Sequence, residues 1–96
     1  MKAFVVYLNG KRLCAAGVGT NGVLTTNITW AGGGPKRTAD DHLGFHVGGL
    51  DSRTGEHLDW SVPELKVGDR VSVKIIETEQ IDRESRRYIP DLAGAG

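Results

Sequence analysis

Apolar and polar residues alternate with a period of two through most of the chain, and the 3.6-residue period of helices is nearly absent. Residues that favour turns, such as Asn-Gly, Gly and Pro, separate the alternating segments. The pattern predicts an all-β domain, either a small antiparallel β-sandwich or a barrel of about six strands. The alternating segments are residues 2–8, 11–18, 23–30, 42–50, 56–62 and 70–79.

Two Asn-Gly pairs predict how the first three strands connect. Asn9-Gly10 and Asn21-Gly22 each lie between alternating segments, and Asn-Gly favours the two-residue type I′ turn because both positions take positive φ. Two such turns in succession predict an N-terminal three-strand meander. One face of this meander is apolar and contains Phe4, Val6, Leu8, Leu13, Ala15, Leu24, Ile28 and Trp30.

A second hairpin is expected after residue 41. If residues 52–55 form a four-residue loop, Asp51 lies opposite Glu56 and the apolar residues of both strands share one face. A three-residue loop would split that apolar set. We expect both tryptophans, Trp30 and Trp60, in the core. The apolar face of this hairpin contains Phe45, Val47, Leu58, Trp60 and Val62.

The opposite face of the meander is too apolar for a face exposed only to water. A sheet with one solvated face normally alternates apolar with clearly polar residues, and an exposed apolar patch usually marks an interaction site. We therefore expect self-association through this face, most simply as a symmetric homo-oligomer. The alternative is that the chain covers the face itself. The residues expected at the contact are Val5, Tyr7, Cys14 and Ala16.

Residues 80–96 are expected to form a C-terminal tail, extended or partly helical, attached to a single all-β domain of residues 1–79. Asp82 and Arg86 have the i,i+4 spacing of a helical ion pair, and Pro90 would end such a helix. The tail also carries a short apolar hook, which we expect to dock on a neighbouring subunit. The hook consists of Tyr88, Ile89 and Leu92.

Length and cysteine content narrow the class of protein. The chain has 96 residues and a mass of 10.3 kDa, which suits one domain. Its single cysteine, Cys14, excludes an internal disulfide framework and a zinc site built on several cysteines. No apolar run approaches the ~18 residues of a membrane span. We expect a soluble, cytoplasmic protein without a membrane partner.

The net charge is zero, but the charges are unevenly distributed along the chain. Residues 1–37 hold five of the twelve basic residues and no acidic residue, whereas residues 38–96 hold the other seven together with all twelve acids. This asymmetry predicts either a basic face for an anionic partner or complementary segments that meet in the fold. The alternative is that folding intermixes the two halves.

The glycine-rich segment 32–37 is the best candidate for an anion site. Its backbone N–H groups and two adjacent basic side chains suit a phosphate, as in a nucleotide or nucleic acid. It is not a P-loop, because the spacing differs and no helix is expected to follow. An ordinary surface loop is the alternative. The candidate residues are Gly33, Gly34, Lys36 and Arg37, extended by Lys11 and Arg12.

Residues suited to catalysis or metal binding are sparse. His46, His57 and Asp59 share one face of the expected second hairpin, but the two histidines are offset along it, so we expect no metal site. No serine or cysteine nucleophile lies beside them. We therefore expect no cofactor and no enzymatic activity. The function that we expect is a small β module that self-assembles and binds a protein partner; the alternative is an anion-binding protein for nucleotide or nucleic acid.

Overall fold

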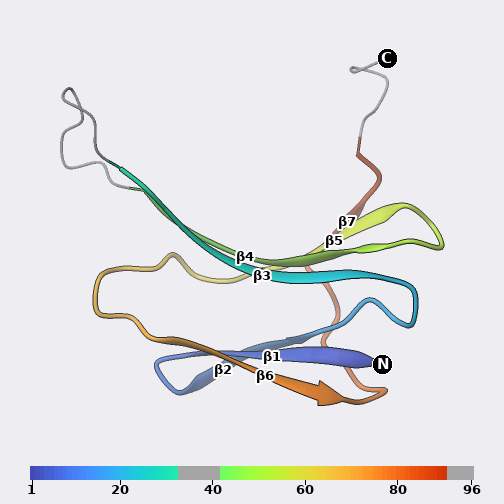
Figure 1. Ribbon diagram of the computed structural model, residues 1–96, viewed down its shortest axis with the longest axis horizontal. Coiled ribbons are helices and arrows are strands. Elements are labelled where there is room, and N and C mark those ends of the chain that lie inside the picture. Colours follow the sequence, from blue (N-terminus) through green and yellow to red (C-terminus); the bar gives the residue numbers. More distant parts are fainter. Residues whose placement is uncertain (33–41, 91–96) are drawn as a thin grey trace.

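The computed structural model describes residues 1–32 and 42–90, which form seven β-strands and no helix (Figure 1). All strand pairs are antiparallel, and they build two sheets with the strand orders β2-β1-β6 and β3-β4-β5-β7. The all-β prediction is confirmed. The strands are β1 (Lys2–Leu8), β2 (Lys11–Ala16), β3 (Gly22–Ala31), β4 (His42–Asp51), β5 (Glu56–Trp60), β6 (Val71–Glu77) and β7 (Arg86–Tyr88).

The two sheets face each other around one small core (Figure 1). Each sheet contributes three fully buried residues, and partly buried neighbours such as Phe45 and Val62 pack around them. The apolar face predicted for the second hairpin is therefore confirmed at the positions that the core uses. With no helix among the described residues, none is long and apolar enough to cross a membrane. The buried core residues are Val6, Cys14, Ala16, Val47, Leu58 and Trp60.

The first hairpin forms as its sequence predicts. Asn9 and Gly10 have φ values of 52° and 82°, so both turn residues adopt the left-handed conformation that Asn-Gly favours. The Asn9 side chain also accepts a hydrogen bond from the Arg70 amide (2.9 Å) and donates one to Asp69 (3.0 Å). These two hydrogen bonds connect the β1–β2 turn to the turn that precedes β6.

A β-bulge in β2 changes which residues of the hairpin face the core. Near the turn the register is the expected one, but Val6 lies opposite Cys14, so Leu13 is an extra residue in β2. One inserted residue moves the following side chains to the opposite face of the sheet. Cys14 and Ala16 therefore point into the core and are buried. Their predicted position on the outer face is wrong.

The predicted three-strand meander is also wrong, because β3 pairs with β4 in the other sheet. Neither Asn21 nor Gly22 has a positive φ, so no type I′ turn forms there. Instead the chain passes from one sheet to the other after Ala16, with Gly19 at a φ of 87°. The Asn21 carbonyl then accepts the Ser52 amide (3.0 Å) of the other hairpin. Tertiary pairing, and not the local turn signal, decides this connection.

The second hairpin has the predicted four-residue loop, with Asp51 opposite Glu56. The Asp51 side chain is buried and accepts hydrogen bonds from the Arg53 amide (3.0 Å) and guanidinium (3.2 and 3.3 Å). These contacts lower the pKa of Asp51 from its ordinary value. Its carbonyl accepts the Gly55 amide (2.8 Å), which closes the loop.

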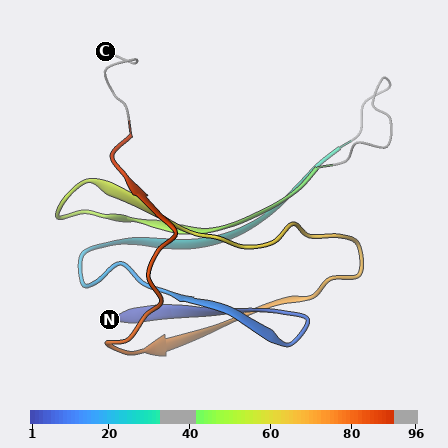
Figure 2. The ribbon, with the colours of Figure 1, turned by 180° about the vertical axis from the view of Figure 1, so that it is seen from behind.

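The segment between β6 and β7 crosses from one sheet to the other (Figure 2). At its centre the Asp82 amide donates to the Ala15 carbonyl (2.8 Å), and the Asp82 carboxylate accepts from the Ala15 amide (3.0 Å) and twice from Arg12 (3.0 Å each). The Asp82 carbonyl accepts from Trp60 Nε1 (2.9 Å) in the facing sheet. Asp82 therefore pairs with Arg12, and no helical turn with Arg86 forms.

Beyond this crossing, β7 adds to the edge of β5, so residues expected in a tail become part of a sheet. The Ser85 hydroxyl accepts the Ser61 amide (2.8 Å), and the Ser85 amide donates to the Asp59 carbonyl (2.8 Å). The extended form of the expected tail is thus observed for residues 86–88. One side of the sandwich is closed by these contacts.

Replacing Asp82 by Asn tests this closure. The hydrogen bond from Arg12 is the main reason that the pKa of Asp82 is lowered. A hydrogen bond to a charged group is worth about 1.5–3 kcal/mol, but both side chains are about half exposed and screened by water. We expect Asp82→Asn to lower the free energy of unfolding at pH 7 by about 1 kcal/mol, measured by urea denaturation.

The same variant should change the acid dependence of stability. A lowered carboxyl pKa stabilises the fold above the ordinary value near pH 4 and loses that effect as the pH falls through the folded-state value. Below about pH 4 the wild type should therefore lose stability more steeply than Asp82→Asn. Glu64→Gln is the control and should keep the wild-type slope, because the Glu64 carboxylate is exposed and forms no ion pair within residues 1–32 and 42–90. Equal slopes for the wild type and Asp82→Asn would refute the role of Asp82.

A buried hydroxyl predicts a stabilising substitution. Among the described residues, Thr26 Oγ1 is buried without a hydrogen-bond partner, which costs about 1–3 kcal/mol. Thr26→Val keeps the shape and removes that cost, so thermal unfolding should shift upward by several degrees. Thr25→Val is the matched control, because the Thr25 hydroxyl donates to the Gly48 carbonyl (3.3 Å) and no gain is expected. A lower melting temperature for Thr26→Val would contradict the prediction.

Candidate assembly surface

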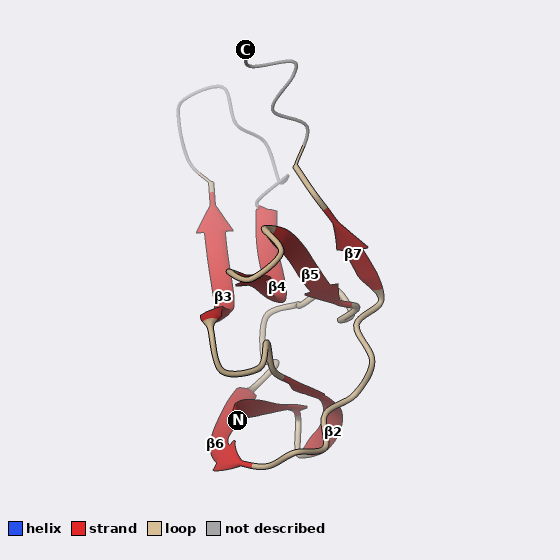
Figure 3. Ribbon diagram, turned by 90° about the vertical axis from the view of Figure 1, so that its right-hand side faces the viewer, coloured by secondary structure: helices blue, strands red, loops and turns tan. Residues whose placement is uncertain are grey.

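No segment among residues 1–32 and 42–90 closes the side of the sandwich away from Asp82. Figure 3 shows β3 and β6 at this side and β7 and β2 at the other, and β3 and β6 are both edge strands. Ile28 and Trp30 lie opposite Phe45 and Leu43, on the face of β3 that is directed toward the other sheet. They are nevertheless 56% and 64% exposed. The prediction that Trp30 belongs to the core is wrong.

The length of the strands explains this exposure. β3 and β4 each have ten residues, whereas the facing strands β1, β2 and β6 have six or seven. The far ends of β3 and β4 also curve away from the facing sheet (Figure 1). Trp30 therefore lies where no strand of the facing sheet can cover it.

β6 presents apolar side chains on the same open side. Val73 lies opposite Val6 and Ile75 opposite Phe4, so both belong to the inner face of their sheet. They are 42% and 68% exposed, because β6 is at the edge. We call Ile28, Trp30, Val73 and Ile75 the open-side surface. Exposed apolar groups of this size usually mark a contact with another molecule.

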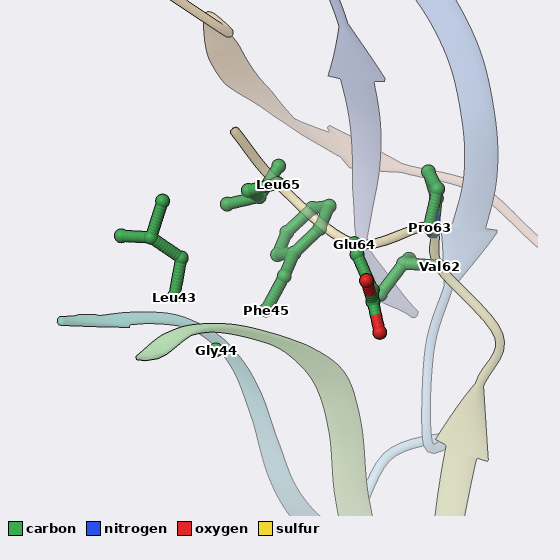
Figure 4. Close-up of a pocket in the computed structure, with 7 residues that line it drawn as sticks. All are labelled: Leu43, Gly44, Phe45, Val62, Pro63, Glu64 and Leu65. Atoms are coloured by element: carbon green, nitrogen blue, oxygen red, sulfur yellow. The ribbon is translucent and has the colours of Figure 1, made fainter. Parts of the chain in front are cut away.

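A cleft of about 420 Å³ continues this surface at the far end of β4. In Figure 4 the side chains of Leu43 and Phe45 rise from β4 toward Leu65, which lies on the opposite wall. Because Leu43 and Phe45 are the cross-strand neighbours of Trp30 and Ile28, the cleft and the open-side surface adjoin. The lining residues are Leu43, Gly44, Phe45, Val62, Pro63, Glu64 and Leu65.

The residues predicted for self-association are scattered by the fold. Cys14 and Ala16 are inside the core, and Val5 is buried on the other face of its sheet, so these three offer almost no surface. Tyr7 is half-buried. Burial raises the pKa of the Cys14 thiol, and the nearby Asp82 carboxylate adds to this effect, so the thiol is poorly reactive.

The predicted hook does not act as one unit in the described part of the chain. Tyr88 belongs to β7, with its ring 5.6 Å from the His57 ring and the Arg86 guanidinium 4.1 Å above it. Ile89 is 67% exposed. Leu92 lies outside the described residues. Only Ile89 therefore remains from this set as a freely exposed apolar side chain in residues 86–90.

Most residues of the candidate anion site lie outside the residues that the structure describes. Gly33, Gly34, Lys36 and Arg37 lie in the undescribed residues 33–41. Lys11 is exposed at the β1–β2 turn, whereas the Arg12 guanidinium is bound by Asp82. Arg12 is therefore already neutralised by a carboxylate of the same chain.

The basic N-terminal and acidic C-terminal parts of the chain meet in the fold. Lys2 pairs with Glu77, and Arg12 pairs with Asp82. Each pair joins a basic residue of the first strands to an acid near or after β6. Of the alternatives for the charge asymmetry, these contacts match complementary segments that meet each other.

His46 and His57 lie on the outer face of the four-stranded sheet and share it with Asp59, as predicted. His46 Nε2 is 2.8 Å from Asp59 Oδ1. These two residues and His57 line a hollow of about 280 Å³. A Cβ on Gly48 would lie 2.6 Å from His46 Cε1, so glycine permits this close approach. In the described ranges no three His, Cys, Asp or Glu side chains are grouped to bind a metal ion.

Comparison with known proteins identifies no relative of this chain. The chain matches no family model, and it has no significant match to a curated protein or to a solved structure.

Sequence reasoning missed the open-side surface because it assigned Ile28 and Trp30 to the core. A signal was nevertheless present. Residues 13–35 contain no charged residue, although a quarter of the whole chain is charged. Such a long uncharged stretch exceeds what the small core uses, since much of β3 is exposed.

Proposed function

We propose that this protein is a non-enzymatic β module that associates with itself through the open-side surface. The observation that carries the proposal is the exposure of four large apolar side chains on the inner faces of β3 and β6, two edge strands on the same side of the sandwich (Figure 3). Inner faces of a sandwich are normally covered, so these residues have the character of an incomplete core. A second copy supplies matching apolar residues from the same surface.

Burial of these four side chains favours association. Full burial of a large apolar side chain is worth about 1.5–3 kcal/mol, and the four residues are about half exposed on average. Covering them therefore contributes roughly 4 kcal/mol from each copy, which offsets part of the entropy lost on association. Leu43 and Phe45 of the adjoining cleft can add to the contact.

The same surface is the place at which we propose that a protein partner binds. Among the described residues that line its cleft, Glu64 is the one with an ionisable side chain, and such a lining suits an apolar protein segment better than a phosphate. Cys14 is a free, buried cysteine, which fits the reducing cytoplasm that we expect for this protein.

Substitution of Ile28 and Trp30 tests self-association. We expect the double variant Ile28→Thr/Trp30→Thr to be monomeric at concentrations at which the wild type forms a discrete oligomer, measured by sedimentation velocity. Ile89→Thr is the matched control, because Ile89 is equally exposed but lies after β7, at the opposite edge of the same sheet. Circular dichroism should show that both variants keep the β fold, since all three side chains are mostly exposed.

Trp30 fluorescence gives a test without substitution. Trp60 is buried in the monomer, so a blue shift of the emission on increasing the protein concentration reports the burial of Trp30. A wild type that stays monomeric, with constant emission up to high concentration, would contradict the proposed function. Loss of the oligomer in Ile89→Thr alone would assign assembly to the C-terminal residues instead.

A further inference from the structure

The edges of the two sheets differ in how well they are protected against pairing with another strand. An exposed edge strand is a template for strand addition unless charges, proline, short length or a covering segment prevents it. The β2 edge is covered at Ala15 by both backbone and side chain of Asp82. β6 carries Lys74 and Glu77, and β7 has only three residues, two of them arginine.

In the part of the chain that the structure describes, residues 22–30 of β3 have none of these protections. β3 is an edge strand of ten residues, GVLTTNITWA, without charge or proline, and in the described part of the chain its strand partner is β4. Its inner-face residues include the exposed Ile28 and Trp30. Its outer face carries Thr25, Asn27 and Thr29, which suit contact with water. The strand is therefore built as a member of a wider sheet with one apolar and one polar face.

We propose that β3 pairs, antiparallel and edge to edge, with β3 of a second copy around a two-fold axis near Thr26 and Asn27. The proposal rests on the proposed self-association and adds the seam through which it occurs. The two four-stranded sheets would join into one continuous sheet of eight strands. Backbone hydrogen bonds along the seam would add to the apolar contacts of the open-side surface.

Charge identifies the partner strand as a second copy. A two-fold axis places each residue near the axis opposite itself or its near neighbours in the other copy. A charged residue there would face its own charge, which destabilises a strand pair. Lys74 would create this conflict in β6, and Arg86 and Arg87 in β7. β3 contains no charged residue and so avoids it.

The faces of the strand also agree with the symmetry. A two-fold axis perpendicular to the sheet keeps inner face beside inner face, so directly opposed residues differ by an even number of positions. With the axis at Asn27, Trp30 lies opposite Leu24 of the other copy. With the axis at Thr26, Ile28 lies opposite that Leu24. In both registers the apolar inner face continues across the seam.

Spin labels on the outer face of β3 locate the axis. We would replace Thr25, Asn27 and Thr29 by cysteine, one at a time, and attach a spin label to each. Pulsed electron paramagnetic resonance then measures the distance between the labels of the two copies. In an antiparallel pair the distance between a label and its copy grows by about 7 Å for each residue from the axis. We expect the shortest distance at Asn27, or equal distances at Thr25 and Asn27, and one about 14 Å longer at Thr29. The buried thiol of Cys14 should stay unlabelled, and the labelled wild type checks this.

A charge introduced at the seam gives an independent test. Asn27→Lys places two like charges near the axis and leaves the open-side surface intact. We expect the dimer dissociation constant to rise at least about tenfold at low salt and to recover partly at high salt, where the repulsion is screened. Ser72→Lys, an exposed substitution on β6, is the matched control and should leave the constant unchanged.

The outcomes separate the two proposals. A dimer with short distances along β3 and sensitivity to Asn27→Lys supports the seam. A dimer in which labels at β3 stay far apart, or in which Ser72→Lys alone weakens association, overturns the seam while the proposed self-association stands. A strict monomer overturns both. If the β3 amides of that monomer exchange more slowly only when an extended peptide is added, the edge serves a different chain.

Discussion

Asp82 holds the two sheets together at one side, through four hydrogen bonds to β2 and one from Trp60 in the facing sheet. Because its backbone and side chain both take part, a single residue covers the β2 edge and binds the indole of a buried core residue. The contact adjoins the small core, because Trp60 packs there with buried residues of β1, β2, β4 and β5. This contact closes one side of the sandwich and so determines which side stays uncovered.

Closing one side leaves the other side uncovered. A chain of this size buries only about two thirds of the surface of its unfolded form, and residues 82–88 lie along β2 and β5. Ile28 and Trp30 of β3 and Val73 and Ile75 of β6 consequently stay exposed on the inner faces of their sheets. The open-side surface and the β3 edge adjoin, so one partner molecule can cover both. The hollow beside His46 and Asp59 lies on the outer face of the same sheet and would stay accessible in such an assembly.

The distribution of charged residues also separates β3 from β1, β2 and β6. Basic residues of the first strands meet acids that follow them late in the chain, as in Arg12–Asp82 and Lys2–Glu77. These pairs lie on the surface and contribute modestly to stability. They place charge on β1, β2 and β6, whereas β3 contains no charged residue. The uncharged stretch of residues 13–35 therefore supplies part of the core and, through Ile28 and Trp30, part of the surface that we propose for assembly.

Local chemistry in the sequence determined the all-β class, the Asn9-Gly10 turn, the four-residue loop after Asp51 and the shared face of His46 and Asp59. Each depends on neighbours in the chain or on a period of two, which a strand imposes on any sequence. Only tertiary structure decided the bulge at Leu13, because it places Cys14 in the core, and the passage of β3 into the second sheet. It also decided that Trp30 is exposed, since this depends on how far β3 extends beyond strands that are distant in the sequence. Turns and alternation are local, whereas sheet membership and burial depend on which distant strands compete for the same partner.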